Sequence, residues 1–138
     1  MKRQTIAVIA PGDMGSGVGQ ALSRGGHDVV TSLTGRSVES RTRAERHGFR
    51  DLVDLDIVVR EASLILSILP PAAAVALATD VSAAMERSGV RPVYMDCNAI
   101  SPDNSRRVAR IMEAAGAPYI DCGIIGLAPG KGPQPTRL

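Results

Sequence analysis

Short apolar runs alternate along the chain with longer segments whose apolar residues recur every three or four positions. The short runs are rich in β-branched residues and are bounded by glycine, proline or polar clusters, which is typical of buried strands. The run at 63–69, SLILSIL, is the most hydrophobic and is expected at the centre of a sheet. The strands predicted in this way cover residues 5–10, 27–33, 63–69, 92–96 and 118–122.

The segments between these runs carry helical patterns. Met14, Val18 and Leu22 share one face of a first helix. Ser101 followed by Pro102 is the signature of a helix N-cap and first turn. Further helices are predicted over 38–47, which is polar and arginine-rich, over 72–85, and from residue 101 to residue 115; the segment 52–62 is ambiguous and is expected to be partly helical.

The repeated order of strand then helix predicts the fold class. It favours an α/β, doubly wound (Rossmann) fold with a mostly parallel sheet of about six strands and helices on both faces. One domain is expected over residues 1–126. The remaining segment, 127–138, is rich in proline and glycine without periodicity and is interpreted as a tail or linker.

The segment from Ala10 to Gly15, APGDMG, carries the candidate chemistry, because it lies between the first strand and the first helix. Gly12 would let the backbone approach a pyrophosphate, and Gly15 would let the start of the helix pack closely. Free N–H groups and the helix dipole would then face the anion. A glycine-rich turn without a ligand is the alternative. The position between a strand and a helix favours dinucleotide binding.

The segment after the second predicted strand points to the form of the dinucleotide. NAD-binding domains usually carry an acidic residue there, which holds the ribose 2′-hydroxyl. No aspartate or glutamate stands between Val29 and Val38, and the first charged residue is Arg36. Because a guanidinium pairs well with a phosphate, NADP(H) is predicted and NAD is the less favoured cofactor. A solvated surface arginine is the alternative interpretation.

Charge and composition exclude several classes of function. The net charge is +2, and no basic run with interleaved aromatic residues is present, so nucleic-acid binding is not expected. No apolar stretch has the length of a membrane span, and no signal-peptide region precedes the first strand, which favours a cytoplasmic protein without membrane contact. Cys97 and Cys122 are expected to be buried free thiols, since metal-binding or redox pairs usually show CxxC spacing or a nearby histidine. No metal site is predicted.

Several motifs together resemble one family. Their order and spacing are similar to those of the N-terminal domain of the β-hydroxyacid dehydrogenase superfamily, which includes 6-phosphogluconate dehydrogenase, 3-hydroxyisobutyrate dehydrogenase and the imine reductases. The resemblance covers nearly the whole chain. It rests on the residues 12–15, 21–22, 26–29, 35–37, 67–71, 96–102 and 121–126.

The resemblance implies a role for each matching position. The pyrophosphate would be faced by Gly12, Asp13, Met14 and Gly15, and the 2′-phosphate would be held by Arg36 and Ser37. The cofactor's ribose would be bordered by Leu69, Pro70 and Pro71. Asn98 would lie near the nicotinamide ribose and the substrate.

Two departures from the family pattern concern the substrate side. Where family members commonly have Ser-Gly-Gly, this chain has Ile125 and Gly126 followed by leucine, so these two residues and Asn98 are the substrate-side candidates. The family's catalytic lysine lies in a helical C-terminal domain, and the lysines here are Lys2 and Lys131. The catalytic residue is therefore unknown, and the isolated chain is expected to be weakly active or inactive.

The favoured function is an NADP(H)-binding domain of an oxidoreductase. The complete enzyme would transfer a hydride between NADP and a small hydroxyacid- or imine-type substrate, with a helical partner domain supplied. A stand-alone, non-catalytic NADP-binding or interaction protein is the alternative. A methyltransferase is disfavoured, because those enzymes need an acid after the second strand. Without its partner domain the chain should expose Ile124, Ile125 and Leu127, so a homo-oligomer is expected.

The cofactor preference can be tested at Arg36. Replacing it by alanine (Arg36→Ala) should weaken NADPH binding by about tenfold or more, because one charge-assisted contact to the 2′-phosphate is lost. NADH affinity should stay unchanged. Calorimetric titration of both variants with both cofactors measures this, and equal wild-type affinities for NADPH and NADH would refute the preference.

Overall fold

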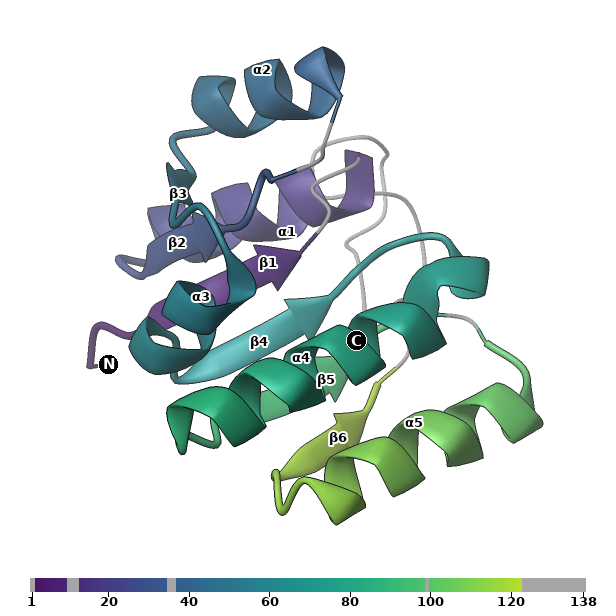
Figure 1. Ribbon diagram of the computed structural model, residues 1–138. Helices are drawn as coiled ribbons and strands as arrows, with labels where there is room; N and C mark the ends of the chain where they lie inside the picture. The colour runs from purple at the N-terminus through teal and green to yellow at the C-terminus, as the bar shows by residue number, and fades with distance from the viewer. Residues whose placement is uncertain (1, 10–12, 35–36, 99, 123–138) are drawn as a thin grey trace.

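Figure 1 shows the chain as a twisted sheet with helices on both faces. The structure is a computed structural model, and it describes residues 2–9, 13–34, 37–98 and 100–122. Within these residues, no helix is both long enough and apolar enough to cross a lipid bilayer. The predicted tail at 127–138 lies outside the described residues.

Over the described residues, six strands form one sheet in which every pair of neighbours is parallel. The strand order is β3-β2-β1-β4-β5-β6, so the predicted doubly wound sheet is confirmed. The strands are β1 (Thr5–Ile9), β2 (Asp28–Thr31), β3 (Arg50–Asp51), β4 (Leu64–Ser67), β5 (Val93–Asp96) and β6 (Tyr119–Asp121). Five of them fall within the predicted runs. The sixth, β3, was not predicted, because two exposed residues at a sheet edge leave no hydrophobic signal.

The helices follow the predicted pattern, and they include the segment that the sequence left ambiguous. They are α1 (Asp13–Arg24), α2 (Val38–Arg46), α3 (Leu55–Glu61), α4 (Ala74–Ser88) and α5 (Pro102–Ala114), with a 3₁₀ turn η1 (Pro71–Ala73) before α4. The segment 52–62 is helical from Leu55, because the Asp54 side chain accepts a hydrogen bond from the Ile57 N–H at 3.1 Å and caps α3. Ser101 caps α5 as predicted, with a 3.2 Å bond from the Asn104 N–H.

Alternation along the strands divides the core between the two faces of the sheet. On one face Ala7, Ile9, Ile65 and Tyr94 pack in a cluster with buried residues of α3, α4 and α5. These three helices lie side by side at the front of Figure 1. On the other face a second cluster joins alternate strand residues, such as Val8 and Leu66 of β1 and β4, to α1 and α2. Both faces of β1 and β4 are therefore buried, as the apolar run at 63–69 predicts.

One close contact fixes α1 against the β2–β3 side of the sheet. Gly19 is buried, and a Cβ added there would lie 2.1 Å from Cζ of the Phe49 ring. Phe49 is itself buried in the second core cluster, with 7% of its surface exposed. The absence of a side chain at Gly19 is therefore a packing requirement rather than a backbone one.

This contact predicts the effect of a methyl group at Gly19. Gly19→Ala should destabilise the fold by about 1–3 kcal/mol, because the Phe49 ring must shift within a packed core. The higher helix propensity of alanine offsets only about 1 kcal/mol. Urea unfolding measures the difference, and Phe49→Leu in the Gly19→Ala background should recover part of the loss. A Gly19→Ala chain as stable as the original would contradict the packing argument.

Candidate functional site

The carboxyl ends of all six strands meet at one edge of the sheet, and the strand order reverses between β1 and β4. Ile9 and Ser67, the last residues of these two strands, are register partners. Connections that leave neighbouring strands toward opposite faces open a crevice at such a point, and ligands of open α/β sheets bind there. The candidate site is therefore the edge beyond Ile9 and Ser67.

The N-terminus of α1 opens onto this edge, since the helix begins at Asp13, shortly after β1 ends at Ile9. The predicted strand and helix on either side of the glycine turn are confirmed. Gly15 is buried, and Met14 packs against the second core cluster. Gly12 and the side chain of Asp13 lie outside the described residues.

Ser16, in the first turns of α1, was not among the predicted site residues. Its Oγ is buried and lacks a hydrogen-bond partner among the described residues, and the residue is 3% exposed. A buried hydroxyl without a partner is unfavourable, so it is expected to be satisfied by a further group. A phosphate at the helix N-terminus would accept from it, which makes α1 a fitting cradle for a dinucleotide. The neighbouring glycine turn is the sequence signal that could have drawn attention to Ser16.

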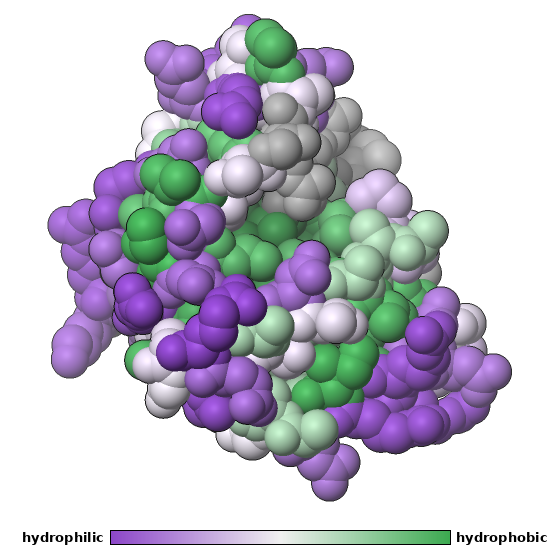
Figure 2. Space-filling view, in the orientation of Figure 1, coloured by the Kyte–Doolittle hydropathy of each residue, from purple (hydrophilic) through white to green (hydrophobic). Residues whose placement is uncertain are grey.

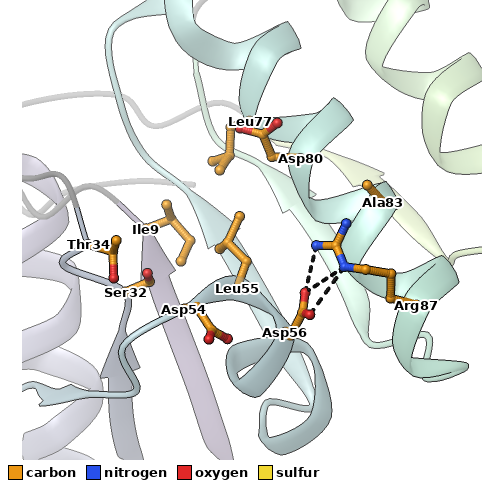
Figure 3. A pocket seen from close by; sticks show the side chains of 10 residues that line it. All are labelled: Ile9, Ser32, Thr34, Asp54, Leu55, Asp56, Leu77, Asp80, Ala83 and Arg87. Carbon is orange, nitrogen blue, oxygen red and sulfur yellow. Dashed lines mark hydrogen bonds and ion pairs between the residues drawn. The ribbon is translucent and has the colours of Figure 1, made fainter.

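A cavity of about 560 Å³ lies beside this edge, between β1, β2, α3 and α4. Figure 3 shows its residues converging from these elements. Ile9, Leu55 and Leu77 form its apolar part, and Figure 2 shows a green hollow there within a largely polar surface. The remaining lining residues are Ser32, Thr34, Asp54, Asp56, Asp80, Ala83 and Arg87.

A hydrogen-bonded network joins the loop after β2 to the segment after β3. The Ser32 hydroxyl donates to the Val53 carbonyl at 2.9 Å, and the Thr34 hydroxyl donates to the same oxygen. The Asp51 carboxylate accepts from the N–H groups of Leu33, at 3.2 Å, and Val53, at 2.9 Å. The loop that would carry the 2′-phosphate group is thus held by residues 51–53, which sequence reasoning had not singled out.

Val53 occupies an unusual backbone conformation within this network. Its φ is +71°, in the left-handed region that β-branched residues rarely adopt. The side chain is largely exposed, so packing does not explain the strain. The conformation instead directs the carbonyl toward the two hydroxyls and the N–H toward Asp51. Backbone strain of this kind is typical of ligand-binding segments.

Acidic groups gather around the mouth of the cavity. Asp56 pairs with Arg87 across α3 and α4 at 2.6 Å (Figure 3), and the hydrogen bond from this guanidinium lowers the pKa of the Asp56 carboxyl. Asp54 and Asp80 bring two further carboxylates, while the hydroxyls of Ser32 and Thr34 already donate to the protein. The cavity is therefore rich in hydrogen-bond acceptors, which suits a ligand with hydroxyl and amino donors.

Asn98 connects the loops that follow β4 and β5. Its Oδ1 accepts from the Leu69 N–H at 2.8 Å, and its Nδ2 donates to the Ser67 Oγ at 2.9 Å. The residue is 8% exposed. The structure thus brings Leu69 and Asn98 together, and Pro70 and Pro71 follow Leu69 on the exposed surface. Because both ends of the amide are used within the protein, Asn98 is in a position to orient the loop; its contact with cofactor or substrate stays a prediction.

The aspartates at the ends of β5 and β6 each accept a hydrogen bond from a neighbouring segment. Asp96 Oδ1 accepts from the backbone N–H of Asn98 at 2.8 Å, and Asp121 accepts from the Ser105 hydroxyl at 3.0 Å. Asp96 is fully buried, and burial raises the pKa of its carboxyl. The hydrogen bond to this carboxyl fixes the start of the loop that contains Asn98.

The remaining predicted residues are only partly described. Ser37 caps α2, with its Oγ accepting from the Ser40 N–H at 3.1 Å. Arg36, Ile125 and Gly126 lie outside the described residues, so their roles stay predictions. Over the part of the chain that the structure describes, no group of three or more histidine, cysteine or acidic residues could hold a metal ion.

The chain matches a protein-family model, curated proteins and solved structures. Residues 5–133 match the family model of the NAD-binding domain of 6-phosphogluconate dehydrogenase. A curated relative, glycerol-3-phosphate dehydrogenase [NAD(P)+] of Streptococcus pneumoniae, is 26% identical in an alignment of 125 residues, and the match covers 82% of this chain and 36% of the relative.

Two solved structures resemble the chain closely in fold. The 3-hydroxyisobutyrate dehydrogenase of Mycobacterium tuberculosis, solved with L-serine, is 26% identical with a TM-score of 0.77, over 92% of this chain and 42% of the other. A conserved protein described as similar to 3-hydroxyacid dehydrogenases is 28% identical with a TM-score of 0.79, over 93% of this chain and 46% of the other. The chain thus spans less than half the length of each of these proteins.

The Asn98 geometry predicts a coupled loss of stability and cofactor binding. Asn98→Ala should leave the Leu69 N–H without its partner and destabilise the fold by about 1–3 kcal/mol. Dinucleotide affinity should fall as well, because the Leu69–Pro71 loop is no longer held. Asn104→Ala, on the surface of α5, is the matched control and should change neither property. Urea unfolding and fluorescence titration with NADPH measure both, and an Asn98→Ala chain that matches the control would overturn the positioning role.

Proposed function

The chain belongs to the family of the NAD-binding domain of 6-phosphogluconate dehydrogenase, and on that premise we propose that it binds NADP(H) for a hydride-transferring oxidoreductase. The substrate would be a small molecule of the hydroxyacid or imine type. The chain spans only part of its relatives, so the role proposed for its own residues is cofactor binding.

One observation carries this proposal. At the point where the strand order reverses, α1 begins just beyond β1, and the cavity begins at Ile9, the last residue of that strand. The two halves of a dinucleotide need such an arrangement, with a helix N-terminus for the pyrophosphate and a cavity beside it for one nucleoside. The unpartnered Ser16 hydroxyl supports the assignment of the pyrophosphate to α1.

The adenosine half fits the cavity between α3 and α4. Ile9, Leu55 and Leu77 would contact the flat faces of the base, and the carboxylates of Asp54 and Asp80 would accept from its amino group or from ribose hydroxyls. The opposite half of the cofactor would then extend along the sheet edge toward the Leu69–Asn98 loops. This orientation agrees with the residues that the family resemblance assigns to the nicotinamide side.

The preference for NADP over NAD rests on the loop after β2. It contains Arg36 and no acidic residue, and it ends at Ser37, the N-cap of α2, where N–H groups and the helix dipole favour an anion. The nearby Asp51 carboxylate accepts from two backbone N–H groups instead of facing a ribose. Together these features favour a 2′-phosphate over a free 2′-hydroxyl.

The proposed position of the cofactor implies what the cofactor and the protein would each contribute to the reaction. The bound nicotinamide supplies the hydride chemistry, while the protein binds and orients it. In this chain, α1 would hold the pyrophosphate, and the loop after β2 would hold the 2′-phosphate. Asn98 would hold the loop that lies beside the nicotinamide ribose. Proton transfer to the substrate would come from residues beyond this domain, so the isolated chain should bind cofactor without turning over substrate.

The cavity assignment is tested by two tryptophan substitutions on α4. Ala83 lines the cavity, whereas Ala76 is exposed on the same helix and is not among the residues that line it. Ala83→Trp should weaken NADPH binding by about tenfold or more, because the indole occupies space that the adenosine needs, and Ala76→Trp should bind normally. Calorimetry measures both, after circular dichroism confirms that the variants fold.

The same titrations separate the competing functions. S-adenosylmethionine should produce no heat, whereas binding of S-adenosylmethionine in place of NADPH would favour a methyltransferase. Equal affinities of the Ala83→Trp and Ala76→Trp chains would remove the cofactor from this cavity. Rapid NADPH oxidation by this chain with a keto acid or an imine would contradict the proposal that the chain binds the cofactor without catalysis.

A further inference from the structure

The two cysteines of the chain stand next to each other at the ends of neighbouring strands. Strands β5 and β6 are parallel, and Asp96 and Asp121 are register partners at their ends. Cys97 and Cys122 are the residues that follow, and the ladder continues to them, since the Cys122 N–H donates to the Asp96 carbonyl at 2.8 Å. Far apart in the sequence, the two residues are thus adjacent across the sheet.

Both side chains also point to the same face. They belong to the core cluster on the α1 side of the sheet, where Cys97 is buried and Cys122 packs against the cluster. Neighbouring strands lie about 4.8 Å apart. Disulfide-bonded cysteines usually have Cα atoms about 4.4–6.8 Å apart, so the strand spacing lies within that range.

The environments of the two thiols differ. Cys97 is 6% exposed, whereas Cys122 is half-buried and more accessible, so the expectation that both thiols are buried is wrong for Cys122. Burial is the main cause that raises the pKa of the Cys97 thiol to about 12, and the neighbouring Cys122 thiol contributes to the same rise through charge and a side-chain hydrogen bond. The pair therefore has one accessible member and one protected member in direct contact, an arrangement in which the first can react and the second can resolve the product.

We propose that Cys97 and Cys122 form a redox-active pair that reacts with small disulfides, such as glutathione disulfide, and closes an intrachain disulfide. Neither cysteine takes part in a disulfide in this structure. The inference stands on the β5–β6 geometry and does not rest on the proposed cofactor.

The exchange proceeds in two balanced steps. The Cys122 thiolate attacks one sulfur of glutathione disulfide, so an S–S bond to Cys122 forms and one glutathione thiolate leaves. The Cys97 sulfur, losing its proton to solvent, then attacks the Cys122 sulfur of this mixed disulfide and releases the second glutathione. The protein pair has lost two electrons and two protons, and one glutathione disulfide has become two glutathione thiols.

The bond would join the ends of two strands close to the loop that Asn98 organises. It would enclose α5 and the connection back to β6 in a covalent loop. Restricting this segment in the unfolded chain stabilises the fold, and a midpoint rise on the order of 10 °C is expected for a loop of this length. Oxidation should therefore be visible both as a loss of thiols and as a thermal shift.

Equilibration with glutathione redox buffers of increasing oxidant content, followed by alkylation with N-ethylmaleimide and mass spectrometry, tests the proposal. The wild-type chain should lose both thiols together, gain no glutathione mass and melt at a higher temperature. Cys97→Ala should instead accumulate a stable mixed disulfide on Cys122. Cys122→Ser should keep Cys97 as a free thiol under the same conditions, because Cys97 is buried.

Three results would overturn the proposal. The wild-type chain could end with glutathione on Cys122 while Cys97 remains a thiol that N-ethylmaleimide alkylates. This result would show that the two sulfurs cannot reach bonding geometry. The chain could form disulfide-linked dimers instead of an internal bond. Both thiols could also stay free under conditions in which the Cys97→Ala chain reacts at Cys122. NADPH binding by the reduced chain tests the proposed function separately and has no bearing on these outcomes.

Discussion

The parallel direction of all six strands is the constraint on which the rest of the structure depends. Parallel neighbours require a crossover between strands, and right-handed crossovers place the helices on the two faces in a fixed order. The strand carboxyl ends therefore meet at one edge. The start of α1, the loop after β2, the Leu69 loop and Asn98 belong to different parts of the sequence, and this edge brings them together as one candidate site.

Side chains bound to backbone groups give that edge its shape. Asn98 connects the loops after β4 and β5, and Asp51 connects those after β2 and β3. In each case one polar side chain satisfies amide groups that the end of a strand leaves without a ladder partner. The strained conformation of Val53 is maintained in the same way. The shape of this edge thus depends on residues that hold loops, in addition to those expected to touch a cofactor.

The adjacent cysteines belong to the same edge and show a second consequence of parallel pairing. In the register of β5 and β6, Tyr119 pairs with the buried Tyr94 and packs against the core, and a slip by one residue would move its ring to the opposite side of the sheet. The same register aligns the residues that follow each strand. A constraint that serves core packing therefore places Cys97 beside Cys122, close to the loop that Asn98 organises.

The sequence by itself determined the α/β class, five of the six strands, the capped start of α5 and the position of the glycine turn, because hydrophobic period and capping are local properties. Tertiary structure decided the short strand β3, the start of α3 and the hydrogen bonds of Asp51 and Val53, which show no local pattern. It also decided that Asn98 holds Leu69 and that Cys97 meets Cys122. These contacts join residues separated by whole βα units, so only the strand order and register of the folded sheet can specify them.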